Sequence, residues 1–83
     1  MKQFKIKIEV RLKSGVLDPQ GKAVLGALHN LGYKEVEDTR VGKLIELRVQ
    51  DENPQKVRER VEEMCKKLLA NPVIEDYLIE VET

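Results

Sequence analysis

The sequence contains few of the residues that carry most enzyme chemistry. It has one cysteine, one histidine and no tryptophan in 83 residues. A single cysteine cannot form a disulfide within the chain, and with one histidine it cannot supply the four ligands of a structural zinc site. Glycine-rich phosphate loops of the G-x-x-x-x-G-K or G-x-G-x-x-G type are also absent. The residue pattern alone therefore indicates no active site.

His29 and Cys65 are the remaining candidates for catalytic side chains. A catalytic or metal-binding histidine needs a partner group, and the sequence around His29 supplies none. Cys65 lies in the apolar face of a predicted helix, whereas a reactive thiolate needs an accessible, electropositive environment. We interpret His29 as a partly exposed helix residue and Cys65 as a small core residue.

Net charge and long apolar runs are lacking too. Fifteen basic residues balance fifteen acidic ones, which argues against the clustered basic surface of a nucleic-acid-binding protein. No apolar run approaches the roughly 20 residues that span a bilayer, and the first residues show no signal-peptide pattern. We expect a cytoplasmic protein that binds neither nucleic acid nor a membrane.

The clearest pattern present is a strict alternation of apolar and charged residues over positions 4–12, which predicts a half-buried strand. Shorter alternations predict strands at 45–49 and 76–82, and a weaker one predicts a strand at 35–41. We interpret residues 35–50 as a hairpin with its corner at residues 40–43. The alternative is one strand bent at Gly42.

Two short sequences predict where helices begin: Leu17-Asp18-Pro19-Gln20-Gly21 and Asn53-Pro54-Gln55. Each Asp or Asn is a good N-cap, and each proline fits the first helical position. The first helix should run to about Leu31, before the stop signal Gly32. Gly26 is costly inside a helix and suggests a close neighbouring backbone. The second helix is strongly amphipathic and should end before Asn71-Pro72.

The predicted order is β-α-β-β-α-β in a single domain, residues 1–83. The usual arrangement is α+β and ferredoxin-like, with a four-stranded antiparallel sheet and both helices on one face. The strand at 4–12 would be central, with its outward lysines and arginine beside glutamates of its neighbours. The bare face of so thin a domain predicts a homodimer or a dimer of dimers, formed by stacking sheets or sharing strands.

Two families with this element order do not fit. RNA-recognition domains stack bases on aromatic residues of the open sheet face, where this sequence places lysine, glutamate and arginine. Acylphosphatases need an anion-binding loop with an arginine just after the first strand, but residues 15–22 contain an aspartate and no arginine.

Three segments resemble the signatures of the PurS family, in order and over nearly the whole chain. They are residues 12–24, 36–43 and 64–77. The main departure is Thr39, where an apolar residue is expected. The family forms the small subunit of phosphoribosylformylglycinamidine synthase, an ATP-dependent amidoligase complex of purine biosynthesis.

The resemblance implies a role without catalytic residues, cofactors or metals in this chain. The complex converts formylglycinamide ribonucleotide, glutamine and ATP to formylglycinamidine ribonucleotide. A glutaminase (PurQ-type) subunit releases ammonia, and a synthetase (PurL-type) subunit binds ATP and magnesium. The small subunit bridges the two and assists ammonia transfer. The competing interpretation is a small dimeric regulatory domain that binds an effector and has no enzymatic role.

Five residues are our candidates for contacts with partner subunits: Gln20, Gly21, Arg40, Gly42 and Lys43. Arg40 and Lys43 are two cations beside a glycine, which could hold a phosphate or a partner's carboxylate. A solvated hairpin corner is the alternative. Gln20 and Gly21 have no capping role that would explain them.

Overall fold

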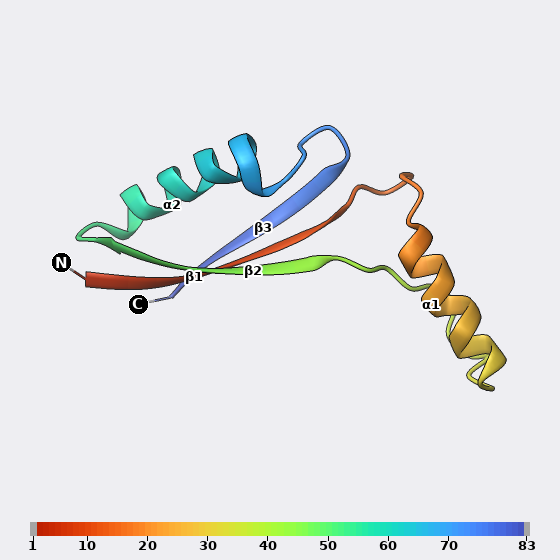
Figure 1. Ribbon diagram of the computed structural model, residues 1–83. Helices are drawn as coiled ribbons and strands as arrows, with labels where there is room; N and C mark the ends of the chain where they lie inside the picture. The colour runs from red at the N-terminus through yellow and green to blue at the C-terminus, as the bar shows by residue number, and fades with distance from the viewer. Residues whose placement is uncertain (1, 83) are drawn as a thin grey trace.

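The computed structural model describes residues 2–82, and its strands build one antiparallel sheet. The elements are β1 (Lys2–Leu12), α1 (Pro19–Asn30), β2 (Lys43–Asp51), α2 (Pro54–Met64), a π-helical turn η1 (Cys65–Leu69) and β3 (Glu75–Glu82). The strand order is β2-β1-β3. Figure 1 shows α2 along one face of the sheet, whereas α1 lies beyond the end of the sheet.

The central position predicted for the first strand is confirmed. Strand β1 pairs with β2 on one side and with β3 on the other. Lys7, which points away from α2, lies opposite Glu46 of β2 and Glu80 of β3. Its Nζ is also 3.9 Å from Glu82. Opposite charges across the strands therefore account for the basic residues on the outer face.

The core lies between the inner face of the sheet and α2 with η1. Its fully buried side chains come from alternate positions of β1 and from positions four apart on the helix: Phe4, Ile6, Ile8, Val10, Val57, Val61 and Cys65. Cys65 is thus a core residue, as predicted. Burial raises the pKa of its thiol, and the nearby Glu62 carboxylate raises that pKa further.

Both helices begin at the residues predicted. Asn53 Oδ1 accepts the amide of Gln55 at 2.9 Å, and Asp18 Oδ1 accepts the amide of Gly21 at 2.9 Å. Helix α1 ends in a Schellman motif, in which Gly32 and Tyr33 donate their amides to the carbonyls of His29 and Leu28. Gly32 has a φ of +102°, which is why glycine stands there.

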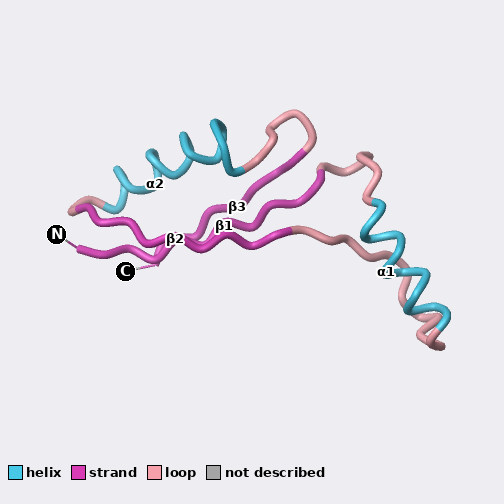
Figure 2. Tube along the Cα trace, viewed as in Figure 1, coloured by secondary structure: helices cyan, strands magenta, loops and turns pink. Residues whose placement is uncertain are grey.

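The predicted fourth strand is wrong for the described chain. In residues 2–82 the sheet has three strands, and segment 35–41 is an irregular return that runs beside α1 (Figures 1 and 2). The hairpin and the single bent strand both fail, because β2 starts only at Lys43. The Val36 carbonyl lies 2.7 Å from His29 Nε2, and the Val41 amide donates to Asp18. These backbone groups are therefore paired with α1 and its cap instead of with a strand.

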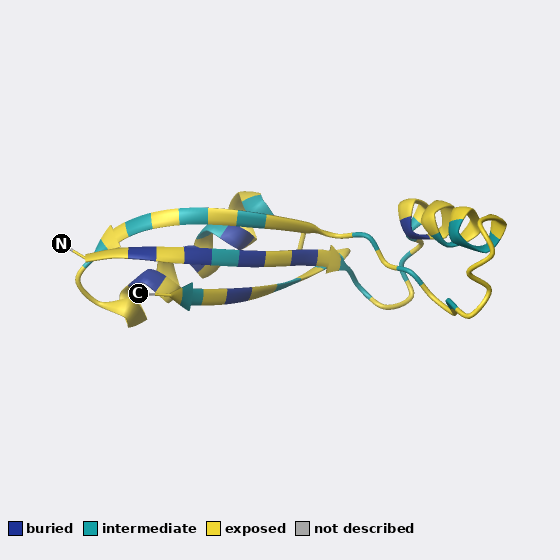
Figure 3. Cartoon of the chain, turned by 90° about the horizontal axis from the view of Figure 1, so that it is seen from below, coloured by how far each residue is buried: buried dark blue, intermediate teal, exposed yellow. Residues whose placement is uncertain are grey.

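The prediction that both helices cover one sheet face is also wrong. Only α2 covers the sheet, and the chain is drawn out to 51 × 25 × 14 Å. Most of α1 is consequently exposed (Figure 3), and its apolar residue Val24 keeps 42% of its surface exposed, while Leu31 just after the helix keeps 74%. Among residues 2–82, no helix combines the length and apolarity that crossing a membrane requires.

Candidate functional site

The segments that lead into α1 and β2 meet beside the end of the sheet. We call residues 17–21 together with residues 39–43 the junction. The partly buried carboxylate of Asp18 joins its two halves, because Oδ1 accepts the Gly21 amide at 2.9 Å and Oδ2 accepts the Val41 amide at 2.9 Å. Asp18 is therefore both the cap of α1 and the link between two segments far apart in the sequence.

Close backbone contacts explain the two glycines of the junction. A Cβ atom on Gly21 would lie 2.4 Å from the Thr39 carbonyl oxygen and 2.6 Å from Asp18 Oδ2. A Cβ atom on Gly42 would lie 2.5 Å from the Val10 carbonyl oxygen. All three distances are far below normal contact, so the junction has no room for a side chain at either position.

Arg40 is exposed and Thr39 is partly buried, and contacts within the chain bear on both residues. The Arg40 guanidinium donates a hydrogen bond to the Leu12 carbonyl oxygen and so fastens the junction to the end of β1. The Thr39 hydroxyl oxygen is buried and has no hydrogen-bond partner among the described residues. An apolar side chain would suit that place better, in agreement with the expectation from the PurS signature.

The structure brings the five candidate contact residues together at the junction. Gln20, Gly42 and Lys43 line a cleft of about 350 Å³ that also reaches the end of β1. The side chains of Gln20 and Lys43 are exposed, whereas Gly21 is buried. For Gly21, Arg40 and Gly42, contacts within the chain already give a reason for the residue type. A role for any of the five in binding a partner stays a prediction.

The link between Asp18 and Val41 is the feature that sequence reasoning missed. The capping role of Asp18 could be predicted from its neighbours, since Asp18 stands directly before Pro19. The second acceptor of the same carboxylate serves an amide 23 positions away. Spacing contains no signal for such a contact.

Acid should weaken the junction. The pKa of Asp18 lies below its usual 3.8, mainly because the carboxylate accepts the Gly21 amide and then the Val41 amide. The Asp18 carboxylate therefore stabilises the folded state fully above the pKa that Asp18 has in the unfolded chain. This stabilisation is lost as the pH falls through the lower pKa that Asp18 has in the folded state. An Asp18→Asn variant should be less stable than the wild type at neutral pH, by a margin that shrinks below about pH 3.8.

Urea unfolding of both proteins across that range measures the margin. A margin that stays constant from neutral pH to about pH 2 would show that the charge of Asp18 does not stabilise the junction.

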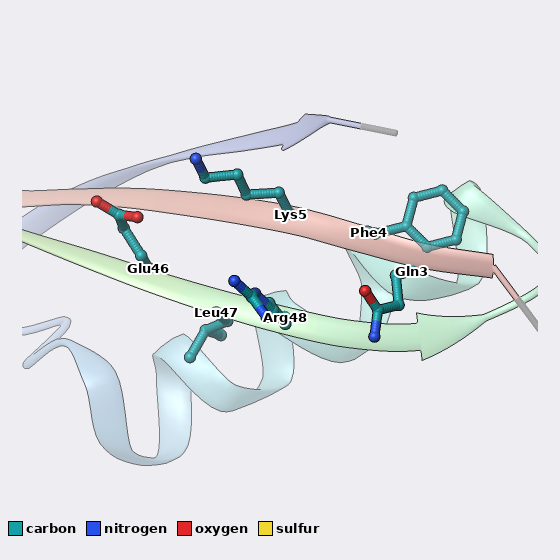
Figure 4. A pocket seen from close by; sticks show the side chains of 6 residues that line it. All are labelled: Gln3, Phe4, Lys5, Glu46, Leu47 and Arg48. Carbon is teal, nitrogen blue, oxygen red and sulfur yellow. The ribbon is translucent and has the colours of Figure 1, made fainter.

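A second depression, of about 310 Å³, lies on the outer face of the sheet (Figure 4). Its polar lining comes from Gln3, Lys5, Glu46 and Arg48. Lys5 lies directly opposite Arg48 in the register of β1 and β2. Like charges opposite each other are unfavourable. Phe4 and Leu47 complete the lining, but four of its six residues are polar or charged, whereas a small-molecule site is lined mostly by apolar side chains.

The remaining chemistry-bearing residues do not gather. Residues 2–82 contain no group of three or more His, Cys, Asp or Glu side chains placed to hold a metal ion. His29 is partly buried and its Nε2 pairs with the Val36 carbonyl, while Cys65 is enclosed in the core. The junction is therefore the one region in the described structure where the candidate residues converge.

Comparison with known proteins identifies the family. Residues 5–83 match the model of the family PurS, described as phosphoribosylformylglycinamidine (FGAM) synthase. The chain is 53% identical over 79 residues to the PurS subunit of that synthase from Bacillus subtilis, which covers 95% of this chain and 93% of that protein. The PurS subunit from Methanocaldococcus jannaschii is 49% identical over 79 residues, covering 95% of each.

Solved structures agree with the sequence relatives. The crystal structure of Methanocaldococcus jannaschii PurS matches with a TM-score of 0.87 at 49% identity over 96% of each chain. A chain in the structure of PurLQS from Thermotoga maritima matches with a TM-score of 0.90 at 38% identity, over 98% of this chain and 99% of that one. Fold and sequence correspond over nearly the whole chain, and the chain therefore belongs to the PurS family of phosphoribosylformylglycinamidine synthase.

Proposed function

We propose that this chain is the non-catalytic small subunit of phosphoribosylformylglycinamidine synthase, a homodimer that works in the cytoplasm. It bridges the glutaminase and synthetase subunits and assists ammonia transfer between them. ATP, magnesium and the nucleotide substrate bind to the synthetase subunit. The observation that carries the proposal is the match to a chain of PurLQS over 98% of this chain, at 38% identity and a TM-score of 0.90.

The geometry of the junction suits a bridging role. Ammonia is small and is easily lost to water or protonated, so its transfer needs partners held in a fixed arrangement more than it needs a catalytic group. The Asp18 carboxylate and the close contacts of Gly21 and Gly42 hold the junction in one backbone conformation. A preorganised surface loses little conformational entropy on binding, which favours a defined docking geometry.

Reconstitution tests the proposed function. The glutaminase and synthetase subunits are mixed with and without this chain, and formation of the amidine is measured with glutamine or with excess ammonium salt. Omitting the chain should abolish the glutamine-dependent reaction and spare the ammonium-dependent one. The glutamate released per amidine formed reports leakage of ammonia. Equal glutamine-dependent turnover without the chain would refute the bridging role.

Lys43 offers the cleanest test of the junction as a docking surface. Its side chain is exposed beside the cleft, whereas Arg40 is tied to Leu12, so that reversing Arg40 would also disturb the junction itself. A Lys43→Glu variant should keep its fold and weaken assembly with the partner subunits at least about tenfold, because it reverses a charge at the contact.

The matched control is Lys56→Glu, which makes the same charge change at an exposed position of α2. Both variants are titrated against the partner subunits by light scattering, after circular dichroism has confirmed the fold. If the two variants assemble equally well, Lys43 is not part of the docking surface.

A further inference from the structure

The outer face of the sheet, on the side away from α2, is uncovered in this chain. Helix α2 and η1 pack on the inner face, and no element within residues 2–82 lies over the outer one (Figures 1 and 3). The outward residues are the odd-numbered ones of β1 and the even-numbered ones of β2 and β3. A solvated sheet face is normally polar, so large apolar residues gathered on it indicate a contact.

Two leucines lie at the same level on the two edge strands of this face. Leu44 of β2 and Leu78 of β3 both lie directly opposite Glu9 of the central strand. Leu44 keeps 55% and Leu78 keeps 57% of its surface exposed. The three residues form one row across the sheet, which we call the Leu-Glu-Leu row. Neither leucine belongs to the core, so packing within the chain does not explain them.

Glu9 differs from the other outward carboxylates of the described sheet. Each of the others lies directly opposite a lysine or an arginine, as Glu46 and Glu80 lie opposite Lys7. Glu9 lies between two leucines instead, and it makes no ion pair within residues 2–82. Its exposed carboxylate is therefore available to a cation from outside the chain.

The surroundings of Glu9 are acidic overall. The Leu-Glu-Leu row and the rows on either side of it carry more carboxylates than cations: Glu9, Glu46, Glu80 and Asp76 against Lys7 and Arg11. Lys7 is also shared with a further row, since its Nζ lies 3.9 Å from Glu82. The potential at this end of the face therefore attracts a positively charged group.

The geometry of the row suits one long cationic side chain. Leu44 and Leu78 lie two strand spacings apart, about 10 Å, with Glu9 between them. A depression of about 150 Å³ beside Glu9 reaches Tyr77 and Leu78, whereas small-molecule pockets have about 300–1,000 Å³. Lysine and arginine carry an aliphatic stem below the charge. The stem would contact the leucines while the charged head meets the carboxylate.

We propose that the Leu-Glu-Leu row docks a partner subunit of the synthase, at a surface where an arginine or lysine projects from apolar neighbours. The cation pairs with Glu9, and the apolar neighbours cover Leu44 and Leu78. Arginine is enriched at protein interfaces and among the residues that dominate their binding energy. The row adjoins the junction, because Leu44 directly follows Lys43. The inference rests on the proposed function and adds a contact surface on the outer face of the sheet.

A second copy of this chain is the less suitable occupant of the outer face. Two outer faces stacked in the same direction would bring Glu9 against Glu9. Turned end for end about the centre of the face, the leucines would meet Lys5 and Arg48. Either arrangement buries charged groups against like charges or apolar side chains, which costs free energy. A partner with one cation among apolar residues has neither conflict.

Removing the charge of Glu9 tests the pairing. Glu9→Gln keeps the size of an exposed side chain, so the fold should be unchanged, which circular dichroism verifies. Its dissociation constant for the partner subunits should rise at least about 30-fold, because the partner's cation would be buried without a counter-charge. Glu59→Gln is the matched control at an exposed position of α2 and should bind like the wild type. Light-scattering titrations measure both variants, and equal binding by the two overturns the proposal.

Photo-cross-linking identifies the occupant. Leu78→Cys is labelled with benzophenone maleimide and mixed with the glutaminase and synthetase subunits, while Cys65 is fully buried and stays unlabelled. We expect the label to attach to a partner peptide that contains an arginine or lysine beside apolar residues. Attachment to a second copy of this chain, to a peptide without a basic residue, or to nothing in an assembled complex overturns the proposal.

The binding measurements separate this inference from the proposed function. A wild-type chain that binds neither subunit refutes the bridging role, and the docking row with it. A wild-type chain that binds, together with a Glu9→Gln variant that binds equally well, refutes the docking row alone.

Discussion

An Ile8→Ala substitution should remove a large part of the stability of this fold. Ile8 is fully buried in the central strand, opposite Ile45 in β2 and Ile79 in β3. Truncation of a buried isoleucine costs about 2–5 kcal/mol, because apolar contacts are lost and a cavity remains. A chain of this size has a total stability of only about 4–12 kcal/mol. The variant should therefore unfold at a much lower urea concentration than the wild type.

Lys7→Ala is the neighbouring control. Lys7 faces the opposite side of the same strand, where its 3.9 Å ion pair with Glu82 is partly exposed. Exposed pairs contribute about 0–1 kcal/mol, so this variant should stay close to the wild type. Both are measured at one protomer concentration, because dimer formation contributes to the apparent stability. Equal losses in the two variants would show that the core is not where the structure places it.

Gly21→Ala should displace α1 from the junction. The added methyl would meet the Thr39 carbonyl oxygen at 2.4 Å and the Asp18 carboxylate at 2.6 Å. Neither group can move away at low cost in free energy, because the Thr39 oxygen belongs to the backbone and the Asp18 carboxylate caps the helix. Overpacking of this kind costs about 1–3 kcal/mol. Faster hydrogen exchange of the α1 amides and of the Val41 amide should report the loss.

Gly26→Ala makes the same chemical change five positions later, but it should stabilise the fold where Gly21→Ala destabilises it. A Cβ at Gly26 would have no heavy atom within 4 Å outside its own helix. The close neighbouring backbone that the sequence suggested is therefore not found in this chain. Alanine should stabilise α1 by up to about 1 kcal/mol through its higher helix propensity. If Gly26→Ala destabilises as much as Gly21→Ala, then a surface absent from the single chain covers that side of the helix.

The two glycines also show how far the candidate site could be predicted. Gly21 drew attention because glycine is a poor helix residue, and partner contact was a reasonable hypothesis. The reason for glycine at this position is the nearby Thr39 carbonyl, which is 18 residues away in the sequence and therefore cannot be predicted from neighbouring residues. Gln20 and Lys43 remain the candidates whose exposed side chains the contacts of this chain do not explain.

Local pattern alone determined β1, both helix starts, the Schellman end of α1 and the burial of Cys65. Each of these depends on residues within a few positions of one another: alternation in β1, Asp or Asn before Pro at the caps, and glycine after Asn30 and Leu31. The PurS resemblance was likewise present in the order and spacing of three segments. These features do not depend on how the elements are arranged in the fold, because the interactions that stabilise them are between nearby residues or come from one clearly apolar face.

Only the tertiary structure decided what became of residues 35–41 and of α1. The weak alternation of that segment does not determine which groups its backbone pairs with. In the structure, its backbone pairs with the side chains of Asp18 and His29 and not with a neighbouring strand. That choice fixed α1 beyond the end of the sheet, so the predicted four-stranded, two-helix layer could not form within one chain. Strand pairing and helix packing depend on which hydrogen-bonding groups and apolar surfaces far away in the sequence still lack a partner. Patterns among neighbouring residues do not contain that information.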